Sequence, residues 1–296
     1  MIKLYMEKSF EVIIFYKYTP VADPEGFVVW VRDLCAKVGI NGRILIAKEG
    51  VNGTVEGTRE QLDVFESALQ GSKFGDFSDL WFKSSVGTGC SFRKLKVKAR
   101  EYILNIGLEE RDIDPNKITG QHIDADELHE MFLNDEDFTI IDMRNDYEFQ
   151  VGRFDKSVDP GMRNFRDLKD VVSGMEELKT KKVVTVCTYG VRCEKASGFL
   201  LENGFQNVSQ LNGGIGTYMK KYPGQNFKGS LYVFDERMTE QFVENYEVVG
   251  ECVACGEKSE RFGNCGNHFC HKQLIICTKC SDEPRMCNGN CGNLKV

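Results

Sequence analysis

The residues best suited to chemistry in this chain lie between Val183 and Ala196, in the sequence VVTVCTYGVRCEKA. Four of the five residues from Val183 to Cys187 are apolar, and β-branched valine suits a strand that is buried on both faces. Gly190 allows a tight turn, and a helical apolar pattern follows that ends at Gly204. The sequence therefore predicts a strand, a cysteine, a short loop and the start of a helix.

In this arrangement the Cys187 thiol faces the amino end of the predicted helix. The N–H groups of the loop and the helix dipole stabilise an anion at that point. We therefore expect a lowered pKa for Cys187 and a thiolate near neutral pH. Such a sulfur acts as a nucleophile or carries a persulfide. The alternative interpretation is that Cys187 is a small buried hydrophobic residue at a strand end.

Two neighbours of Cys187 bear on its chemistry. Cys193 either resolves a persulfide on Cys187 as a disulfide or packs in the first helical turn, and the sequence leaves both open. A phosphatase loop of the Cys-x5-Arg type needs its arginine at position 193, but here the arginine is Arg192. The loop is one residue too short to hold a phosphate, which argues against a cysteine-dependent phosphatase.

A second group of reactive residues lies near the end of the chain, where eight cysteines fall within 40 residues. The two Cys-x2-Cys pairs are typical of zinc knuckles, because the tight turn directs two thiolates at one tetrahedral ion. The predicted metal ligands are Cys252, Cys255, Cys265, Cys270, Cys277, Cys280, Cys287 and Cys291. We expect structural zinc; a redox-labile thiol cluster, disulfides and an iron–sulfur cluster are the alternatives.

The elements that must position these residues predict a mixed α/β and α+β chain of three domains. Residues 1–110 have the order β-α-β-β-α-β of a ferredoxin-like domain, with helices that begin at Pro24 and after Thr58. The strands in this domain are predicted over 12–16, 43–47, 54–56, 80–83 and 93–98, with a turn over 50–53. Residues 101–121 predict a linker.

Residues 122–225 alternate strands and helices, which implies a parallel sheet with helices on both faces. The cysteine loop lies at the carboxyl end of its strand, where open α/β sheets place their ligands. The predicted elements here include a helix from Asp124 to about Leu133, a strand over 139–142, a helix from Asp146 and a helical segment over 175–178. Residues 226–296 form the cysteine-rich C-terminal module.

The composition narrows the class of protein. The chain has 296 residues, of which 41% are hydrophobic and 28% charged, an ordinary globular composition. No apolar run approaches the roughly 20 residues of a membrane span, and the N-terminus does not resemble a signal peptide. We expect a cytoplasmic protein whose 12 cysteines serve as thiols and metal ligands. The net charge of −7 argues against a general polyanion binder.

One local exception to the acidic charge occurs between Lys83 and Arg100, where six basic residues occur without an acidic one. Five of them, Arg93, Lys94, Lys96, Lys98 and Arg100, interleave with apolar residues, so a strand there would present a basic face. From charge alone, the better interpretation is an edge strand that its lysines protect against aggregation.

The second predicted domain resembles the rhodanese family through Asp142-Met143-Arg144-x3-Glu148-x3-Gly152, the Cys187 loop and Leu211-Asn212-Gly213-Gly214. A closer resemblance covers nearly the whole chain. FYKY at 15–18, AKEGVN at 47–52, IDMRN-x-YE at 141–148, CT-x-G-x-RCEKAS at 187–197, VFDERM at 233–238 and the cysteine-rich tail are similar, in the same order, to the bacterial rhodanese-domain proteins that act as tRNA uridine(34) hydroxylases.

This resemblance implies oxygen-dependent formation of 5-hydroxyuridine at the wobble position, with the tRNA anticodon loop as partner. It implies that Cys187 is the persulfide-type cysteine, that Arg192 and the loop backbone hold the sulfur anion, and that Cys193 belongs to the same site. It makes Arg93, Lys94, Lys96, Lys98 and Arg100 the expected phosphate contacts. Tyr189 stands where the family has glycine, and its ring is expected to narrow the loop or stack on a base.

Two other functions fit parts of the sequence. One is a rhodanese-type sulfurtransferase that passes a persulfide sulfur from Cys187 to an acceptor. The other is an RNA-binding adaptor without catalytic activity, in which the rhodanese-like domain is vestigial. No flavin, haem or two-histidine-one-carboxylate iron motif is evident in the sequence, and the way in which oxygen is activated does not follow from it.

Overall fold

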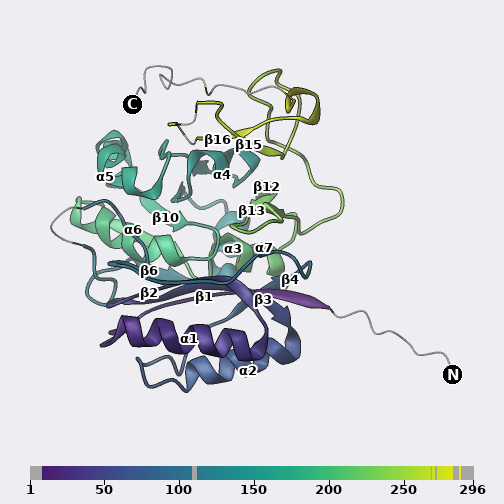
Figure 1. Ribbon diagram of the computed structural model, residues 1–296. Coiled ribbons are helices and arrows are strands. Elements are labelled where there is room, and N and C mark those ends of the chain that lie inside the picture. Colours follow the sequence, from purple (N-terminus) through teal and green to yellow (C-terminus); the bar gives the residue numbers. More distant parts are fainter. Residues whose placement is uncertain (1–8, 109–111, 268, 271, 283–286, 288–296) are drawn as a thin grey trace. The chain divides into compact units, whose positions relative to one another are not determined.

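The computed structural model describes residues 9–108, 112–267, 269–270, 272–282 and 287 (Figure 1). The chain divides into two units. The N-terminal unit extends to Asn105 and includes Asp235–Arg237, and the C-terminal unit contains Ile106–Phe234 and the residues from Met238 onward.

The N-terminal unit is a five-stranded sheet with two helices on one face (Figure 1). Its strands are β1 (Phe10–Tyr18), β2 (Asn41–Ala47), β3 (Gly50–Thr58), β4 (Lys83–Val86) and β5 (Lys96–Ala99), and its helices are α1 (Pro24–Val38) and α2 (Arg59–Gln70). The strand order is β4-β1-β3-β2-β5. The first four strands pair antiparallel, and β5 adds a parallel strand beside β2. The predicted ferredoxin-like arrangement is therefore confirmed.

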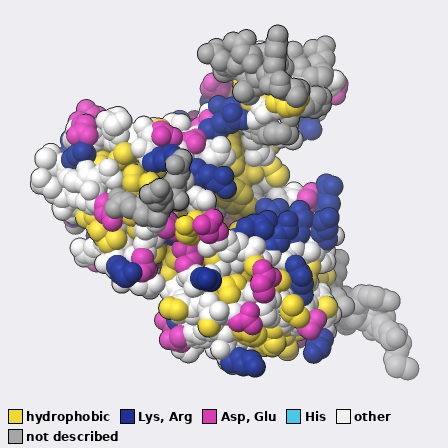
Figure 2. Space-filling model, turned by 60° about the vertical axis from the view of Figure 1, so that its left-hand side comes forward, with side chains coloured by type: hydrophobic (Ala, Val, Ile, Leu, Met, Phe, Trp, Pro, Cys, Tyr) yellow, Lys and Arg dark blue, Asp and Glu magenta, His cyan; other side chains and the backbone are white. Residues whose placement is uncertain are grey.

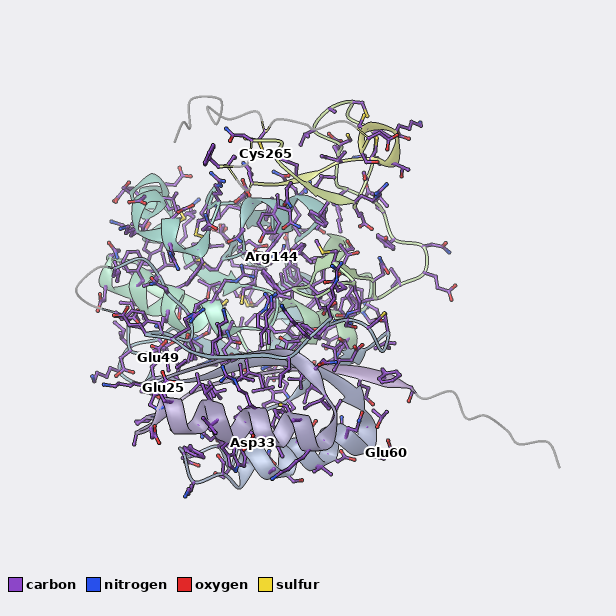
Figure 3. All side chains as sticks on the ribbon, viewed as in Figure 1. Glu25, Asp33, Glu49, Glu60, Arg144 and Cys265 are labelled. Atoms are coloured by element: carbon purple, nitrogen blue, oxygen red, sulfur yellow. The ribbon has the colours of Figure 1, made fainter. Side chains whose placement is uncertain are left out.

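Both helices of this unit begin at the predicted caps. The Asp23 carboxylate accepts a 2.9 Å hydrogen bond from the N–H of Gly26, and Thr58 forms a capping box with Gln61. α1 ends at Gly39, whose φ of 82° lies in the left-handed region that favours glycine. The exposed carboxylates of Glu25, Asp33 and Glu60 lie on the helix layer, as Figure 3 shows.

The predicted turn over residues 50–53 is wrong, because these residues belong to β3. The chain reverses at Lys48 and Glu49, and Ala47 pairs with Gly50. Gly50 has a φ of 146°, and a Cβ there would lie 2.0 Å from the carbonyl oxygen of Lys17. Glycine is required at this position because β3 approaches β1 closely. In the sequence alone, such a glycine looks the same as a glycine in a turn. The strands predicted over 80–83 and 93–98 are also displaced, to β4 and β5.

The C-terminal unit is built on a parallel sheet in the order β6-β11-β10-β7-β9. Its strands are β6 (Gln121–Ile123), β7 (Thr139–Asp142), β9 (Ser157–Val158), β10 (Lys182–Val186) and β11 (Asn207–Leu211). Its helices are α3 (Ala125–Leu133), α4 (Asp146–Val151), α5 (Leu168–Val171), α6 (Val191–Glu202) and α7 (Gly214–Lys221), with 3₁₀ turns at Phe165–Asp167 and Val172–Leu178. The predicted parallel α/β domain is confirmed.

Helices cover both faces of this sheet. Val184 and Val186 of β10 pack with α3 and α7 in one core. Thr185 points to the opposite face of the strand, where its side chain interacts with Cys193 of α6. Part of the predicted linker also packs here, since the Gly120 N–H donates to Ser197 Oγ of α6 at 2.8 Å.

Three short two-stranded sheets complete the C-terminal unit. β8 (Gly152–Phe154) pairs with β12 (Phe227–Gly229), β13 (Leu231–Tyr232) with β14 (Thr239–Glu240), and β15 (Phe262–Asn264) with β16 (Gln273–Ile275); a 3₁₀ turn covers Thr278–Cys280. The β15–β16 hairpin packs on α4 (Figure 1). Ile275, Val151 and Tyr232 form the buried centre of that contact. Among the described residues, no helix combines the length and apolarity that a membrane crossing requires.

Candidate active site

Cys187 lies at the carboxyl edge of the parallel sheet, directly after β10 and four positions before α6 begins at Val191. Gly190 has a φ of 100°, and this left-handed turn brings its N–H to 3.1 Å from the Cys187 Sγ. The side chain of Cys187 is 1% exposed. The loop therefore holds the sulfur in a buried cradle of backbone N–H groups.

Backbone hydrogen bonds from the first turn of α7 hold the Cys187 loop. The N–H of Ile215 donates to the Cys187 carbonyl at 2.9 Å, and the N–H of Gly216 donates to the Thr188 carbonyl at 3.0 Å. Gly214 has a φ of 70°, and a Cβ there would lie 2.5 Å from the Cys187 carbonyl oxygen. The Asn-Gly-Gly motif thus allows two backbone segments to meet under the cysteine.

Cys187 and Cys193 have opposite pKa shifts. Burial raises the pKa of Cys187, but the Cys193 thiol, the charge of Arg192 and the backbone N–H groups of Arg192 and Cys193 outweigh it and lower the pKa to about 6. Burial and the interaction with the Cys187 sulfur raise the pKa of Cys193 well above its ordinary value. Near neutral pH, Cys187 is therefore a thiolate and Cys193 a thiol that donates a hydrogen bond to it.

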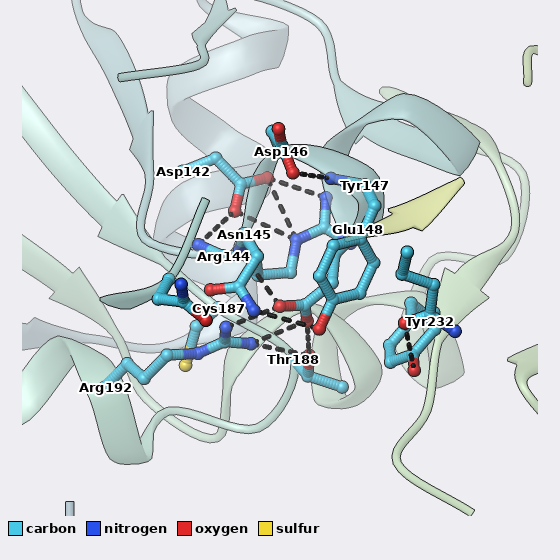
Figure 4. A network of polar contacts seen from close by, with 12 residues as sticks. Asp142, Arg144, Asn145, Asp146, Tyr147, Glu148, Cys187, Thr188, Arg192 and Tyr232 are labelled. Atoms are coloured by element: carbon cyan, nitrogen blue, oxygen red, sulfur yellow. Dashed lines mark hydrogen bonds and ion pairs between the residues drawn. The ribbon is translucent and has the colours of Figure 1, made fainter. Parts of the chain in front are cut away.

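The guanidinium of Arg192 forms a buried ion pair with Glu148 of α4 (Figure 4). Its two terminal nitrogens donate to the Glu148 carboxylate at 2.7 and 2.8 Å, and one also donates to Thr188 Oγ1 at 3.2 Å. The family resemblance implied that Arg192 and the loop backbone hold the sulfur anion. In the structure Glu148 binds the guanidinium, and Arg192 acts on Cys187 through its charge and its backbone N–H.

Glu148 is held in place by the amino end of α4. Its Oε1 accepts a 2.9 Å hydrogen bond from the N–H of Asn145. Before α4, Arg144 and Asp142 form a second buried ion pair at 2.7 Å, and Arg144 also donates to the carbonyl of Gly152 at 2.6 Å. Figure 4 shows the two pairs side by side around Asn145. The Asp-x-Arg segment thereby fixes the turn from which Glu148 reaches Arg192.

Sequence reasoning missed the role of Glu148. The sequence shows a glutamate at the third position of a helix that begins at Asp146, and such a residue predicts a cap. It does cap Asn145, but it also neutralises Arg192. Only the parallel pairing of β7 with β10 brings these distant parts of the chain together, and no local pattern records that pairing.

The predicted basic residues Arg93, Lys94, Lys96, Lys98 and Arg100 are all exposed in the N-terminal unit. Lys96 and Lys98 lie on the face of β5 opposite the buried Val97, and Lys96 is in register with the exposed Arg43 of β2. Arg93 pairs with Glu236 at 2.9 Å. β5 is an edge strand, as the charge pattern alone predicted. Figure 2 shows Lys and Arg side chains gathered in a row on the face it presents.

One carboxylate organises the loop that leads to these residues. Glu56 is buried and accepts hydrogen bonds from the N–H groups of Thr88 at 2.8 Å, Gly89 at 2.9 Å and Ser91 at 2.8 Å. The loop before β5 is therefore fixed rather than free.

Seven of the eight predicted metal ligands lie in two clusters. The sulfur atoms of Cys252, Cys255, Cys277 and Cys280 all lie within 4.8 Å of one another, as do those of Cys265, Cys270 and Cys287. Tetrahedral coordination with Zn–S bonds of about 2.3 Å places neighbouring sulfurs roughly 3.8 Å apart. The Cys255–Cys277 and Cys270–Cys287 sulfur pairs are each separated by 3.7 Å. Both clusters can hold a metal ion; Cys291 lies outside the described residues.

Comparison with known proteins agrees with this geometry. Family models match the chain as "UPF0176 acylphosphatase like domain" over residues 10–103, "Rhodanese-like domain" over 124–221 and "Rhodanase C-terminal" over 228–292. The tRNA uridine(34) hydroxylase of Bacillus velezensis is 40% identical over 292 residues, which cover 97% of this chain and 89% of that protein. Its namesake from Staphylococcus haemolyticus is 40% identical over 280 residues, 93% of this chain and 86% of that protein.

The chain belongs to the tRNA uridine(34) hydroxylase family. It carries the family's domains in order: the acylphosphatase-like domain, the rhodanese-like domain and the cysteine-rich C-terminal segment. The Cys187 loop lies in the rhodanese-like domain. There the pKa of the Cys187 thiol is lowered, and the charge of Arg192 is balanced by Glu148.

The structure places Tyr189 differently from the prediction. Its ring is 4% exposed and packs over Gly216, where a Cβ would lie 2.4 Å from the ring. Its hydroxyl donates to Glu240 at 3.0 Å. Tyr189 therefore fills space behind the loop, and the expected stacking on a base is wrong for this arrangement because the ring has no exposed face.

We expect the alkylation rate of Cys187 by iodoacetamide to rise with pH around a midpoint of about 6, because the thiolate is the reacting form. The fraction of thiolate increases as the pH rises through the pKa. Cys193→Ala removes a hydrogen-bond donor and should move the midpoint upward, whereas Cys193→Ser keeps an O–H donor and should move it less. Peptide-resolved mass spectrometry measures each rate.

Cys35 provides an internal control, since burial raises its pKa to about 12 and it should stay unreactive over this pH range. A Cys187 midpoint at the ordinary value for cysteine would contradict the proposed thiolate.

Proposed function

We propose that this protein hydroxylates tRNA at uridine 34, forming 5-hydroxyuridine with molecular oxygen as co-substrate and Cys187 as the reacting group. The observation that carries the proposal is the buried Cys187 sulfur, which accepts a hydrogen bond from the Gly190 N–H at 3.1 Å in the same site as the Arg192–Glu148 ion pair. It occurs in a chain that is 40% identical over 97% of its length to a tRNA uridine(34) hydroxylase. The substrate implies that the protein works in the cytoplasm.

The proposed role of Cys187 follows from the chemistry of uracil. The C5–C6 double bond of uracil is conjugated with a carbonyl, so a thiolate adds at C6 and makes C5 electron-rich. C5 is the carbon that carries the hydroxyl in the product: one atom of O2 enters it as the C5–H bond breaks, and a two-electron donor with two protons reduces the other atom to water. A sulfur with a pKa of about 6 is a thiolate at neutral pH and a good leaving group when the adduct breaks down. The pKa of Cys193 is raised, so Cys193 stays a thiol and its S–H donates a hydrogen bond to the Cys187 sulfur.

Two further parts of the structure support the proposal. The exposed cations of β5 and the segment before it supply phosphate contacts for the anticodon stem and loop. The two cysteine clusters supply structural zinc sites. In the cluster of Cys252, Cys255, Cys277 and Cys280, four thiolates close the coordination sphere and leave no position for substrate; the other cluster supplies three thiolates. Zinc here would stabilise the hairpin that packs on α4, and through α4 the position of Glu148.

A sulfurtransferase is the second candidate, and the N–H cradle around the Cys187 sulfur favours it, since the same groups stabilise a persulfide anion. The two functions leave different products. One adds oxygen to tRNA, and the other adds sulfur to tRNA or to a protein.

We expect cells that lack this gene to lose 5-hydroxyuridine and its derivatives from tRNA, as measured by nucleoside mass spectrometry. The wild-type gene should restore them, whereas Cys187→Ala should not, because the variant has no nucleophile. Cys90→Ala is the matched control, since Cys90 is an exposed cysteine of the N-terminal unit. Full 5-hydroxyuridine with Cys187→Ala would disprove the catalytic role, and sulfur in the tRNA would favour the second candidate.

The basic segment should contribute to tRNA binding through charge. Replacing Lys96 and Lys98 together by alanine should weaken binding and reduce the slope of log K against log salt by about 1 for every phosphate that the variant no longer neutralises. Lys37→Ala is the control, because Lys37 is exposed in the last turn of α1, on the helix-covered face of the sheet. Equal effects of both changes would show that β5 has no particular role.

Elemental analysis should find two zinc ions in each chain, one for each cysteine cluster. Cys280→Ser should remove one ion, and Cys265→Ser the other, whereas Cys90→Ser should remove neither. Removing zinc with a strong chelator should lower the unfolding temperature, because metal binding contributes to the folding free energy of such segments. Purified protein that contains iron, or no metal at all, would overturn the zinc assignment.

A further inference from the structure

Phe234 is a large apolar side chain that remains exposed beside the Cys187 loop. It is 46% exposed, and its ring centroid lies 5.6 Å from the guanidinium carbon of Arg192. The structure describes two other exposed aromatic side chains, Trp81 and Phe269. Phe234 is the one for which a ring contact with the cysteine loop is observed.

The ring of Phe234 is supported from behind. It meets the ring of Tyr232 edge-on, with centroids 5.0 Å apart and planes at 81°. Tyr232 is itself buried, contacts the ring of Tyr147 on α4 at 5.2 Å, and donates a hydrogen bond to Gln273 at 3.1 Å. The exposed ring thus stands on a buried one, so little conformational freedom is lost when a ligand packs against it.

The chain after Phe234 is also fixed. Arg237 donates to the Asp235 carboxylate at 2.8 and 2.6 Å, and the Asp235 side chain is buried. The residues on both sides of the ring are therefore held, Tyr232 by packing and Asp235 by its ion pair with Arg237.

The ligand chemistry follows from what lies around the ring. An enzyme that modifies a nucleobase takes it out of the base stack, and the unstacked base gains a new stacking partner from an aromatic side chain. The Arg192 guanidinium is bound by Glu148, and Tyr189 is buried, so neither offers a free flat surface at the loop. Phe234 offers one.

We propose that Phe234 is the platform on which the target uracil stacks when it leaves the base stack of the anticodon loop, so that the base is held beside Arg192. Arg192 is the residue that carries charge toward the Cys187 sulfur. This inference rests on the proposed function and adds a substrate-binding residue to it. Recognition is by the flat face of the base, so Phe234 contributes affinity for an unstacked nucleotide and not discrimination between uracil and cytosine.

The test compares two RNAs, an anticodon stem-loop with uridine at position 34 and the same stem-loop with an abasic site there. Fluorescence anisotropy measures the Kd of each with the full-length protein. Phe234→Ala should weaken binding of the uridine RNA about 10-fold, in the range found for loss of one stacked base, and should leave binding of the abasic RNA unchanged. Phe234→Trp should retain the difference between the two RNAs, and Phe234→Leu should lose most of it.

Leu133→Ala is the control for removing an exposed apolar side chain. Leu133 is 71% exposed at the carboxyl end of α3, and α3 begins at the carboxyl edge of the sheet, so its end lies at the edge away from Cys187. This variant should bind both RNAs as the wild type does. The alkylation midpoint of Cys187 in Phe234→Ala reports whether the loop is intact, since Glu148 and not Phe234 holds Arg192.

The outcomes separate this inference from the function on which it rests. If Phe234→Ala binds both RNAs as the wild type does, or weakens both equally, the stacking platform is wrong. If the wild type forms no 5-hydroxyuridine in the uridine stem-loop or in full-length tRNA, the proposed function fails. If the wild type forms it and Phe234→Ala keeps the same kcat/KM, the function stands and the platform is overturned.

Discussion

The buried ion pair between Arg192 and Glu148 is the interaction on which the Cys187 site depends. A thiolate removed from water is costly unless charges and N–H groups compensate it, and a buried guanidinium without a partner is costly as well. Glu148 satisfies both terminal nitrogens of Arg192, so the cation stays in one place. The Cys187 sulfur then accepts a hydrogen bond from the N–H of Gly190, and the charge of Arg192 stabilises its thiolate form.

Because Glu148 must be held still, the structure around α4 matters as much as the loop itself. The Asp142–Arg144 pair fixes the chain before the helix, and the cysteine-rich hairpin covers its other side. Lys272 of that hairpin pairs with Asp146, the first residue of α4, at 2.8 Å. The metal-binding segment and the reactive cysteine are therefore connected through one short helix, although they lie far apart in the sequence.

Much of this could be predicted from the sequence, because the signals are local. The strand–cysteine–loop–helix order around Cys187, the caps at Asp23 and Thr58, and the Cys-x2-Cys pairs all depend on residues within a few positions of one another. The role of Glu148, the packing of Tyr189 and the exposure of Phe234 depend on strand pairing and tertiary contacts. A tyrosine in a glycine position suggests a ring facing the substrate, and only the proximity of Gly216 shows that space exists behind the loop instead.

The hairpin on α4 has a consequence for how this architecture is divided. Tyr147 and Val151 of α4 pack against Tyr232, Phe262 and Ile275 of the C-terminal module, so a rhodanese-like domain excised without that module would expose an aromatic and aliphatic patch to water. The family models divide the sequence between residues 221 and 228, but the hydrophobic contacts of α4 extend across this division. The cysteine-rich module could therefore be lost or replaced during evolution only with compensating polar substitutions on α4. This helix also carries Glu148, the counterion of Arg192.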